Sequence, residues 1–139
     1  EPNWSVDGHH LIFTSDRGGS PQIYKIQLKD RTLQRLSFTG KYNARPVYSP
    51  DEQSIAMVHK GDRGYHIALL DKASGEIKVL TNSTQDESPS FSPNGNMIIY
   101  TTKRNNRSVL AAVSIDGRVH QRLGSQKGNI REPVWGPRR

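Results

Sequence analysis

Apolar residues along this chain gather in short runs of four to six positions, and polar segments rich in Gly, Asn and Asp separate the runs. The runs contain mainly Ile, Val, Leu and Tyr, which are enriched in β-strands. None continues with the spacing of three to four residues that an amphipathic helix requires. Asp7-Gly8 and Asn94-Gly95 favour tight hairpins, because Gly adopts a positive φ without strain. The pattern therefore predicts an all-β chain of short antiparallel strands.

Four copies of one motif divide the chain, each consisting of Pro, any residue, an aromatic residue and then Ser or Gly. The copies begin at Pro2, Pro46, Pro89 and Pro133, which lie 44, 43 and 44 residues apart. Between successive copies the same order of elements returns: strand, turn, strand, loop, strand, turn and strand. A four-stranded unit with this period is typical of a β-propeller blade, whereas a β-sandwich rarely keeps one register over three units.

The sequence predicts an all-β fold, a β-propeller fragment with three four-stranded antiparallel blades plus one extra C-terminal inner strand. The predicted blades are residues 1–45, 46–88 and 89–132, and residues 133–139 form the lone inner strand, which would complete another blade. The central strands are apolar at consecutive positions, as expected of sheets that pack on both faces. The aromatic residues at the third motif position should therefore lie between blades; they are Trp4, Tyr48, Phe91 and Trp135.

Composition and charge exclude several classes of function. The 139 residues include no Cys, which rules out disulfides, thiolate metal sites and a cysteine nucleophile. The mean hydropathy of −0.76 and the absence of a long apolar run indicate that the chain does not insert into a membrane, and no apolar signal segment opens it. The net charge is +7, yet the first and third blades are basic and the second is acidic. Because no single basic stripe with interleaved aromatic residues forms, we expect no nucleic-acid binding.

No motif for catalysis, metal or cofactor binding emerges from the sequence. The five His residues have no ligand spacing, and the adjacent His9 and His10 would point to opposite faces of a strand. The chain lacks a G-x-S-x-G elbow and a phosphate-binding glycine loop. Asp7 and Asp51 fall in turns, where a side-chain bond to the backbone explains them better than acid–base chemistry. We therefore predict no catalytic residues, no metal and no cofactor.

Several segments resemble the WD40-like repeats of TolB-type propellers, and together they cover almost the whole chain. They are Trp4–Gly8, Leu11–Tyr24, Arg35–Ser37, Asp86–Gly95, Val109–Arg118 and Arg131–Pro137, the last three of which are similar to the closing blades of that family. The chain departs from the family pattern at Val6, Glu52 and Gly136, all turn positions.

The resemblance implies a non-enzymatic periplasmic protein of the Tol–Pal system of the cell envelope. It implies a six-bladed propeller after a smaller N-terminal domain. The expected partner is the peptidoglycan-associated lipoprotein, and toxins of the colicin class are expected on the same face.

The best candidates for partner binding are the tetrads that precede the motif prolines. In an up-and-down blade these connections share one end with the loop between the second and third strands. Their side chains differ between repeats while the scaffold repeats, as a recognition surface requires. The resemblance implies that these positions contact the lipoprotein. The predicted partner-binding residues are Tyr42, Asn43, Ala44, Arg45, Gln85, Asp86, Glu87, Ser88, Ile130, Arg131 and Glu132. The alternative is that they are solvated residues that pair with each other.

Three blades do not close a propeller, and exposed blade faces require a partner. We therefore expect either missing blades or self-association of two copies, head to tail, into a six-bladed ring. The alternative function is a gating part of a longer serine peptidase, although the Pro-Arg-Arg ending is typical of a terminus. A third possibility is a propeller fragment without activity of its own.

Overall fold

The computed structural model describes residues 2–125, with side chains through residue 123, and these residues form twelve strands in three sheets. Sheet 1 contains β1 (Asn3–Trp4), β2 (His10–Ser15), β3 (Gln22–Gln27) and β4 (Leu33–Arg35). Sheet 2 contains β5 (Asn43–Tyr48), β6 (Ser54–Gly61), β7 (Gly64–Asp71) and β8 (Ile77–Val79). Sheet 3 contains β9 (Glu87–Phe91), β10 (Met97–Arg104), β11 (Arg107–Ser114) and β12 (His120–Ser125).

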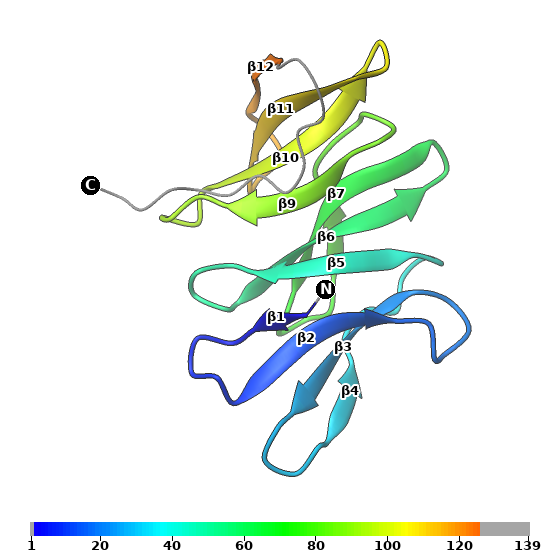
Figure 1. The fold of residues 1–139 in the computed structure, drawn as a ribbon, viewed down its shortest axis with the longest axis vertical. Helices are drawn as coiled ribbons and strands as arrows, with labels where there is room; N and C mark the ends of the chain where they lie inside the picture. Colours follow the sequence, from blue (N-terminus) through cyan, green and yellow to red (C-terminus); the bar gives the residue numbers. More distant parts are fainter. Residues whose placement is uncertain (1, 126–139) are drawn as a thin grey trace.

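Within each sheet the strands follow chain order, and every pair of neighbours is antiparallel. The three sheets stack one above the other along the long axis of the molecule (Figure 1). The predicted arrangement of three four-stranded antiparallel sheets is thus confirmed. The lone inner strand predicted for residues 133–139 lies outside the described residues.

One end of the stack is built from a repeated turn in which a Ser hydroxyl donates to an Asp or Asn two residues later. These pairs are Ser5–Asp7, Ser49–Asp51, Ser92–Asn94 and Ser114–Asp116, at 2.5–2.7 Å. The same Asp or Asn oxygen accepts a backbone N–H two residues further on. These hydroxyl and amide donors hold the pKa values of the three carboxyls below their ordinary range. The expected structural role of Asp7 and Asp51 is confirmed.

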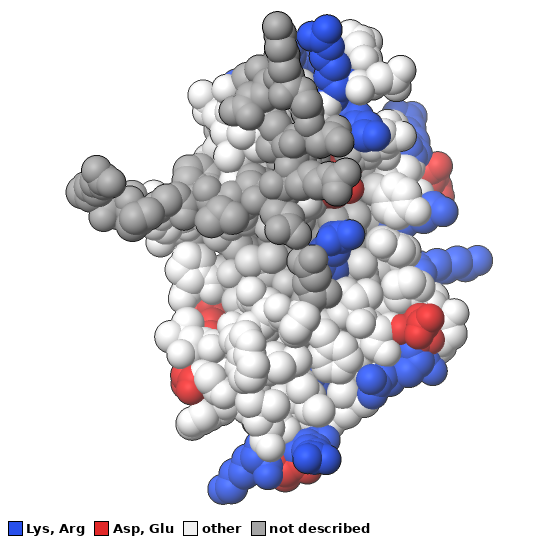
Figure 2. Space-filling view, in the orientation of Figure 1, with Lys and Arg blue, Asp and Glu red and all other residues white. Residues whose placement is uncertain are grey.

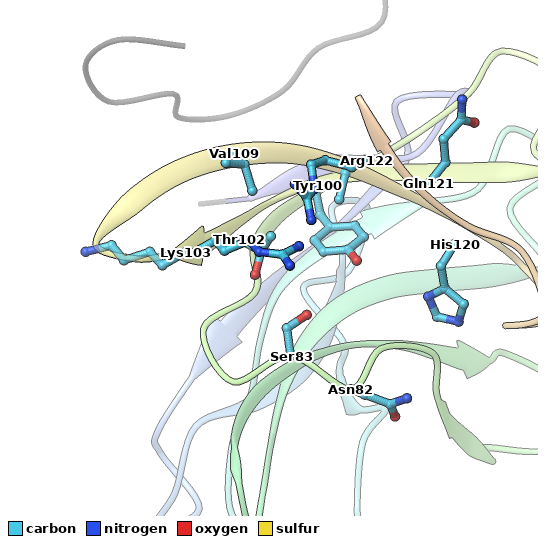
Figure 3. Close-up of a pocket in the computed structure, with 11 residues that line it drawn as sticks. Asn82, Ser83, Tyr100, Thr102, Lys103, Val109, His120, Gln121 and Arg122 are labelled. Carbon is cyan, nitrogen blue, oxygen red and sulfur yellow. The ribbon is translucent and has the colours of Figure 1, made fainter. Parts of the chain in front are cut away.

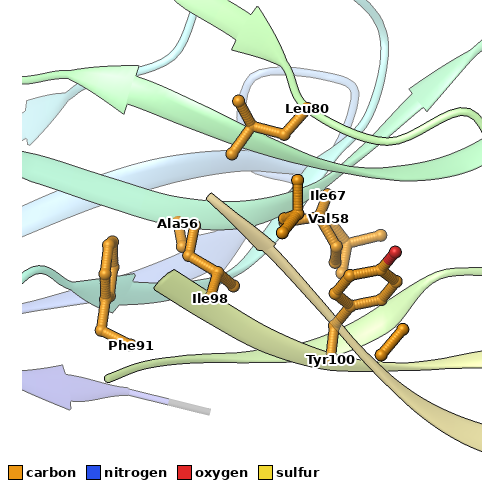
Figure 4. Packing of buried hydrophobic residues seen from close by; sticks show 9 residues of the cluster. Ala56, Val58, Ile67, Leu80, Phe91, Ile98 and Tyr100 are labelled. Atoms are coloured by element: carbon orange, nitrogen blue, oxygen red, sulfur yellow. The ribbon is translucent and has the colours of Figure 1, made fainter. Parts of the chain in front are cut away.

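The core consists of two apolar layers, one on each face of sheet 2. Alternate residues of β6 supply both layers, because successive side chains of a strand point to opposite faces. Ile55 and Met57 pack toward sheet 1, whereas Ala56 and Val58 pack toward sheet 3. The layer against sheet 3 is shown in Figure 4, where Phe91, Ile98 and Tyr100 meet the β6 residues. The consecutive apolar positions in the sequence therefore reflect burial on both faces.

The aromatic residues at the third motif position do not share one environment. Tyr48 and Phe91 are each 8% exposed and lie between sheets, as predicted. Trp4 is 57% exposed, so the prediction is wrong at this residue. The physical reason is its position in the stack: β1 belongs to the first sheet, and among the described residues no sheet covers its outer face. Trp135 lies outside the described residues.

Buried polar side chains link sheets 1 and 2. The His10 Nε2 and Tyr48 hydroxyl lie 2.9 Å apart, and burial raises the pKa of Tyr48 to about 12. Asn43 donates from Nδ2 to Gln22 Oε1 at 2.8 Å and accepts at Oδ1 from His59 Nδ1 at 2.7 Å. Because an amide oxygen only accepts, His59 must carry its proton on Nδ1. Gly40 makes room for this ring, since a Cβ there would lie 2.7 Å from its Cε1.

The buried imidazoles make stability depend on pH. Burial lowers the pKa of both His10 and His59 below the ordinary 6.5, so the folded state favours the neutral rings. Their contribution to stability is complete above about pH 6.5 and is lost as the pH falls through the lowered values. We expect a lower urea midpoint at pH 5.5 than at pH 7.5.

The variant His59→Gln, which keeps a donor for Asn43, should shrink this difference. The matched control His9→Gln changes an exposed ring and should leave it unchanged. Equal midpoints at the two pH values in the wild type would contradict this account of the buried imidazoles.

Candidate functional site

The end of the stack opposite the Ser–Asp turns carries the candidate site, and we call it the pocket end. It contains the connections β2–β3, β4–β5, β6–β7, β8–β9 and β10–β11. The antiparallel order of each sheet brings these connections to one side. Both described tetrads, Tyr42–Arg45 and Gln85–Ser88, lie at this end. The third tetrad, including Ile130, Arg131 and Glu132, lies outside the described residues.

The tetrads are not simple loops, because β5 and β9 already begin at Asn43 and Glu87. Each strand contains a β-bulge where its register shifts, at Arg45-Pro46 opposite Met57 and at Ser88-Pro89 opposite Tyr100. The first bulge residue has a positive φ in both cases, 55° at Arg45 and 54° at Ser88. A β-bulge re-aims the side chains beside it. The sequence motif therefore marks a bulge at the start of the inner strand, not a loop before it.

Burial divides the predicted contact residues into two groups. The exposed or half-exposed side chains are Tyr42, Arg45, Gln85, Glu87 and Ser88. The buried side chains are Asn43, Ala44 and Asp86, at 0%, 4% and 1% exposure. In the free chain the buried group therefore contributes to packing between sheets, and the first group forms the surface that a partner would meet.

A pocket of about 380 Å³ opens at this end between sheets 2 and 3. We call it the tyrosine pocket, and it is lined by Tyr42, Arg45, Val58, Tyr65, Gln85, Asp86, Glu87 and Lys103. Five of these residues were predicted from the tetrads. Val58, Tyr65 and Lys103 were missed, although the expected convergence of the β6–β7 and β10–β11 turns at this end was the signal that could have found the last two.

Two aromatic rings form one wall of the tyrosine pocket. Tyr42 and Tyr65 meet edge to face, with ring centroids 5.2 Å apart and an interplanar angle of 79°. Lys60 Nζ lies 5.7 Å from the Tyr65 centroid, within cation–π range. Tyr42 is half-buried, and Tyr65 remains 37% exposed. The wall is therefore fixed by ring packing and yet accessible.

Backbone contacts hold the second wall against the first. Tyr65 N–H donates to Thr84 O at 2.9 Å, and Asp86 N–H donates to Tyr65 O at 3.1 Å. The β6–β7 turn approaches the β8–β9 connection so closely that a Cβ at Gly64 would lie 2.3 Å from Thr84 O. Gly64 also has φ +128°. The shape of the pocket thus depends on a position that only glycine fits.

Asp86 lies beneath this pocket with only one of its carboxylate oxygens satisfied. Thr81 and Ser83 donate their hydroxyls to Asp86 Oδ2 at 2.5 and 3.0 Å. Thr81 in turn accepts the backbone N–H of Ile67 at 2.9 Å, which ties the carboxylate to sheet 2. Asp86 Oδ1 is buried without a partner, as is Thr102 Oγ1. Leaving a buried acceptor unsatisfied is costly, and such groups need an explanation.

A second groove, of about 480 Å³, lies further out between the same sheets. Its charged lining residues are the cations Lys103, Arg104 and Arg122, and it has no Asp or Glu in its lining. In Figure 3 the side chains of Ser83, Tyr100 and Thr102 point toward a common space in it. Over the face seen in Figure 2, Lys and Arg residues alternate with acidic residues along one edge instead of forming a single basic stripe.

Within residues 2–125, no three side chains of the metal-ligating types gather into a site. The same part of the chain contains no helix long and apolar enough to cross a bilayer. The pocket end offers aromatic faces, charges of both signs and hydrogen-bonding groups.

Comparison with known proteins assigns this chain to one family. Residues 1–139 match the family model described as the TolB beta propeller domain. The Tol-Pal system protein TolB of Bordetella pertussis is 49% identical over 137 residues, which cover 99% of this chain and 31% of that protein. The protein of the same name from Nitrosospira multiformis is 49% identical over 109 residues, 78% of this chain and 25% of the relative.

Solved structures agree with this result. The crystal structure of TolB from Acinetobacter baumannii superposes with a TM-score of 0.92 at 45% identity, covering 99% of this chain and 35% of that chain. The tricorn protease gives a TM-score of 0.67 at 20% identity and shares the fold alone. The chain spans about a quarter to about a third of the length of these TolB relatives.

Replacing Gly64 with Ala tests how the pocket is held. The new Cβ would meet the Thr84 carbonyl, so we expect a loss of about 2–4 kcal/mol in the free energy of unfolding. Gly75→Ala is the matched control, because Gly75 has φ +76° and no atom lies within 4 Å of the place its new methyl group would take; it should lose only about 1–2 kcal/mol. Urea unfolding measures both, and equal losses would contradict the close approach.

Proposed function

The chain belongs to the TolB β-propeller family, and from this premise we propose that it is a non-enzymatic protein-binding part of the Tol–Pal system. We propose that it acts in the periplasm and binds the peptidoglycan-associated lipoprotein through the pocket end. Because the chain spans only part of its relatives, the role of the whole protein is proposed together with that of the fragment.

The observation that carries the proposal is the tyrosine pocket with exposed charges of both signs around it. Buried anchor positions in protein interfaces favour Tyr and Arg, and charged residues at the rim set orientation and association rate. Tyr42 and Tyr65 supply the aromatic wall, while Arg45 and Glu87 supply rim charges of opposite sign. The two sheets below supply a rigid base, so a partner meets a preformed surface.

No observation favours the alternative function as a peptidase gate. The likeness to peptidase propellers lies below 25% identity, and such likeness concerns the fold alone. The turn carboxylates Asp7, Asp51 and Asp116 are used in structural hydrogen bonds. Colicin-type toxins, if they bind, would use the same pocket end and would compete with the lipoprotein.

Charge reversal at the rim tests the proposal. Glu87→Lys should weaken binding of the purified lipoprotein by about tenfold, because it replaces an attractive rim charge with a repulsive one. Arg45→Glu should act in the same direction. Arg131 lies outside the described residues, and the sequence-based prediction is that Arg131→Glu also weakens binding. The control Glu76→Lys reverses an exposed acid at the opposite end and should leave the affinity unchanged. Isothermal titration calorimetry gives the affinities, and equal affinity for Glu87→Lys and Glu76→Lys would refute the chosen end.

A further inference from the structure

We infer that the tyrosine pocket receives a Lys or Arg side chain of the protein partner, with the cationic group on Asp86 and the alkyl stem against Tyr42 and Tyr65. This inference rests on the proposed function and specifies its chemistry. It specifies the charge and shape of the partner's anchor residue. It also assigns to Asp86 the role of selecting that residue.

The first support is the unsatisfied carboxylate. Asp86 is 1% exposed, lines the pocket and has no partner for Oδ1. A carboxylate is an acceptor only, so the missing group must be a donor. Ammonium and guanidinium groups are donors that also carry the complementary charge, and hydrogen bonds between ionised groups are stronger than neutral ones. An anionic or purely apolar ligand would leave the carboxylate unsatisfied.

The second support comes from comparing repeats. In sheet 2 the cross-strand pair Asn43–His59 occupies this position, and His59 Nδ1 donates to Asn43 Oδ1 at 2.7 Å. In sheet 3 the corresponding residues, one step beyond the pair Glu87–Thr101, are Asp86 and Thr102. Both have a buried oxygen without a partner. In sheet 2 the cross-strand residue donates to the acceptor, whereas in sheet 3 the Thr102 hydroxyl makes no hydrogen bond to Asp86 Oδ1.

The third support is the shape of the pocket. A volume of about 380 Å³ is within the range of small-ligand sites and accommodates one long side chain. Val58 forms an apolar surface and the two tyrosines form an aromatic wall, which suit the alkyl stem of Lys or Arg. Lys60 already lies near Tyr65 at 5.7 Å, so a cation is compatible with this ring.

The remaining charges of the pocket do not favour an anion. Arg45 and Lys103 are exposed, so water and salt screen them and their head groups can move. Asp86 is buried, and its field is screened much less. Asp86 is 1% exposed, so an incoming cation must displace the side chains that cover Oδ1. Rotamer changes of exposed side chains take picoseconds to nanoseconds. Anions have a better place in the separate groove lined by Arg104 and Arg122.

Asp86→Asn is the decisive variant, because it removes the charge and keeps the shape. Asn occupies the equivalent position in sheet 2, and its amide oxygen can still accept from Thr81 and Ser83, so the fold should be kept. We expect the lipoprotein to bind at least tenfold more weakly to Asp86→Asn. The matched control Asp62→Asn removes an exposed acid at the same end, outside the pocket lining, and should bind as the wild type does. Equal affinity of wild type and Asp86→Asn would overturn the inference while leaving the proposed function intact.

A second measurement is independent of the lipoprotein. N-acetyl-lysine methylamide and N-acetyl-arginine methylamide, at matched ionic strength, should shift the ring resonances of Tyr42 and Tyr65 in NMR spectra of the wild type. N-acetyl-norleucine methylamide, which has the stem without the charge, should shift them at least fivefold less, and Asp86→Asn should lose the difference. Equal shifts from the charged and uncharged probes would overturn the inference. If these shifts occur and the lipoprotein does not bind the wild type, the cation site stands and the proposed function fails.

Discussion

Burial of both faces of every sheet is the constraint on which this structure depends. Both faces of sheet 2 are buried. On β6, Ile55 and Met57 pack toward sheet 1, whereas Ala56 and Val58 pack toward sheet 3. Because strands are short, each sheet holds too little apolar surface to be stable alone, and stacking supplies the rest. The exposed Trp4 marks a sheet face for which the described residues provide no neighbour.

Stacking also produces the candidate site. Connections from consecutive sheets converge at the pocket end, where repeated backbone positions carry different side chains. In sheet 2, Asn43 accepts from His59 and donates to Gln22 of sheet 1, so these side chains link two sheets. In sheet 3, at the equivalent Asp86 and Thr102, polar atoms remain without partners, and Asp86 lines a pocket. The proposed binding function at this end thus depends on side chains that differ between repeats on a scaffold that the repeat maintains.

The repeat could be predicted from sequence, because the motif of Pro and an aromatic residue returns every 43–44 residues and burial of both sheet faces leaves runs of consecutive apolar residues. Five of the eight residues that line the tyrosine pocket also follow from the sequence. It could not identify Arg45 and Ser88 as bulge residues with positive φ, since neither is a Gly. Nor could it distinguish exposed Glu87 from buried Asp86, because adjacent polar residues look alike until the strand fixes which way each points. Val58 looked like core, and its second role at the pocket depends on packing between sheets.

The central claim is that the pocket end is the surface that recognises a protein partner. Backbone amide shifts of this chain, measured by NMR during titration with the purified lipoprotein, test it most directly. The account predicts that shifts concentrate at residues 42–45, 64–65 and 84–88 while the turns at 50–53, 72–76 and 93–96 stay unchanged. Shifts confined to those opposite turns, or spread evenly over both ends, would contradict it.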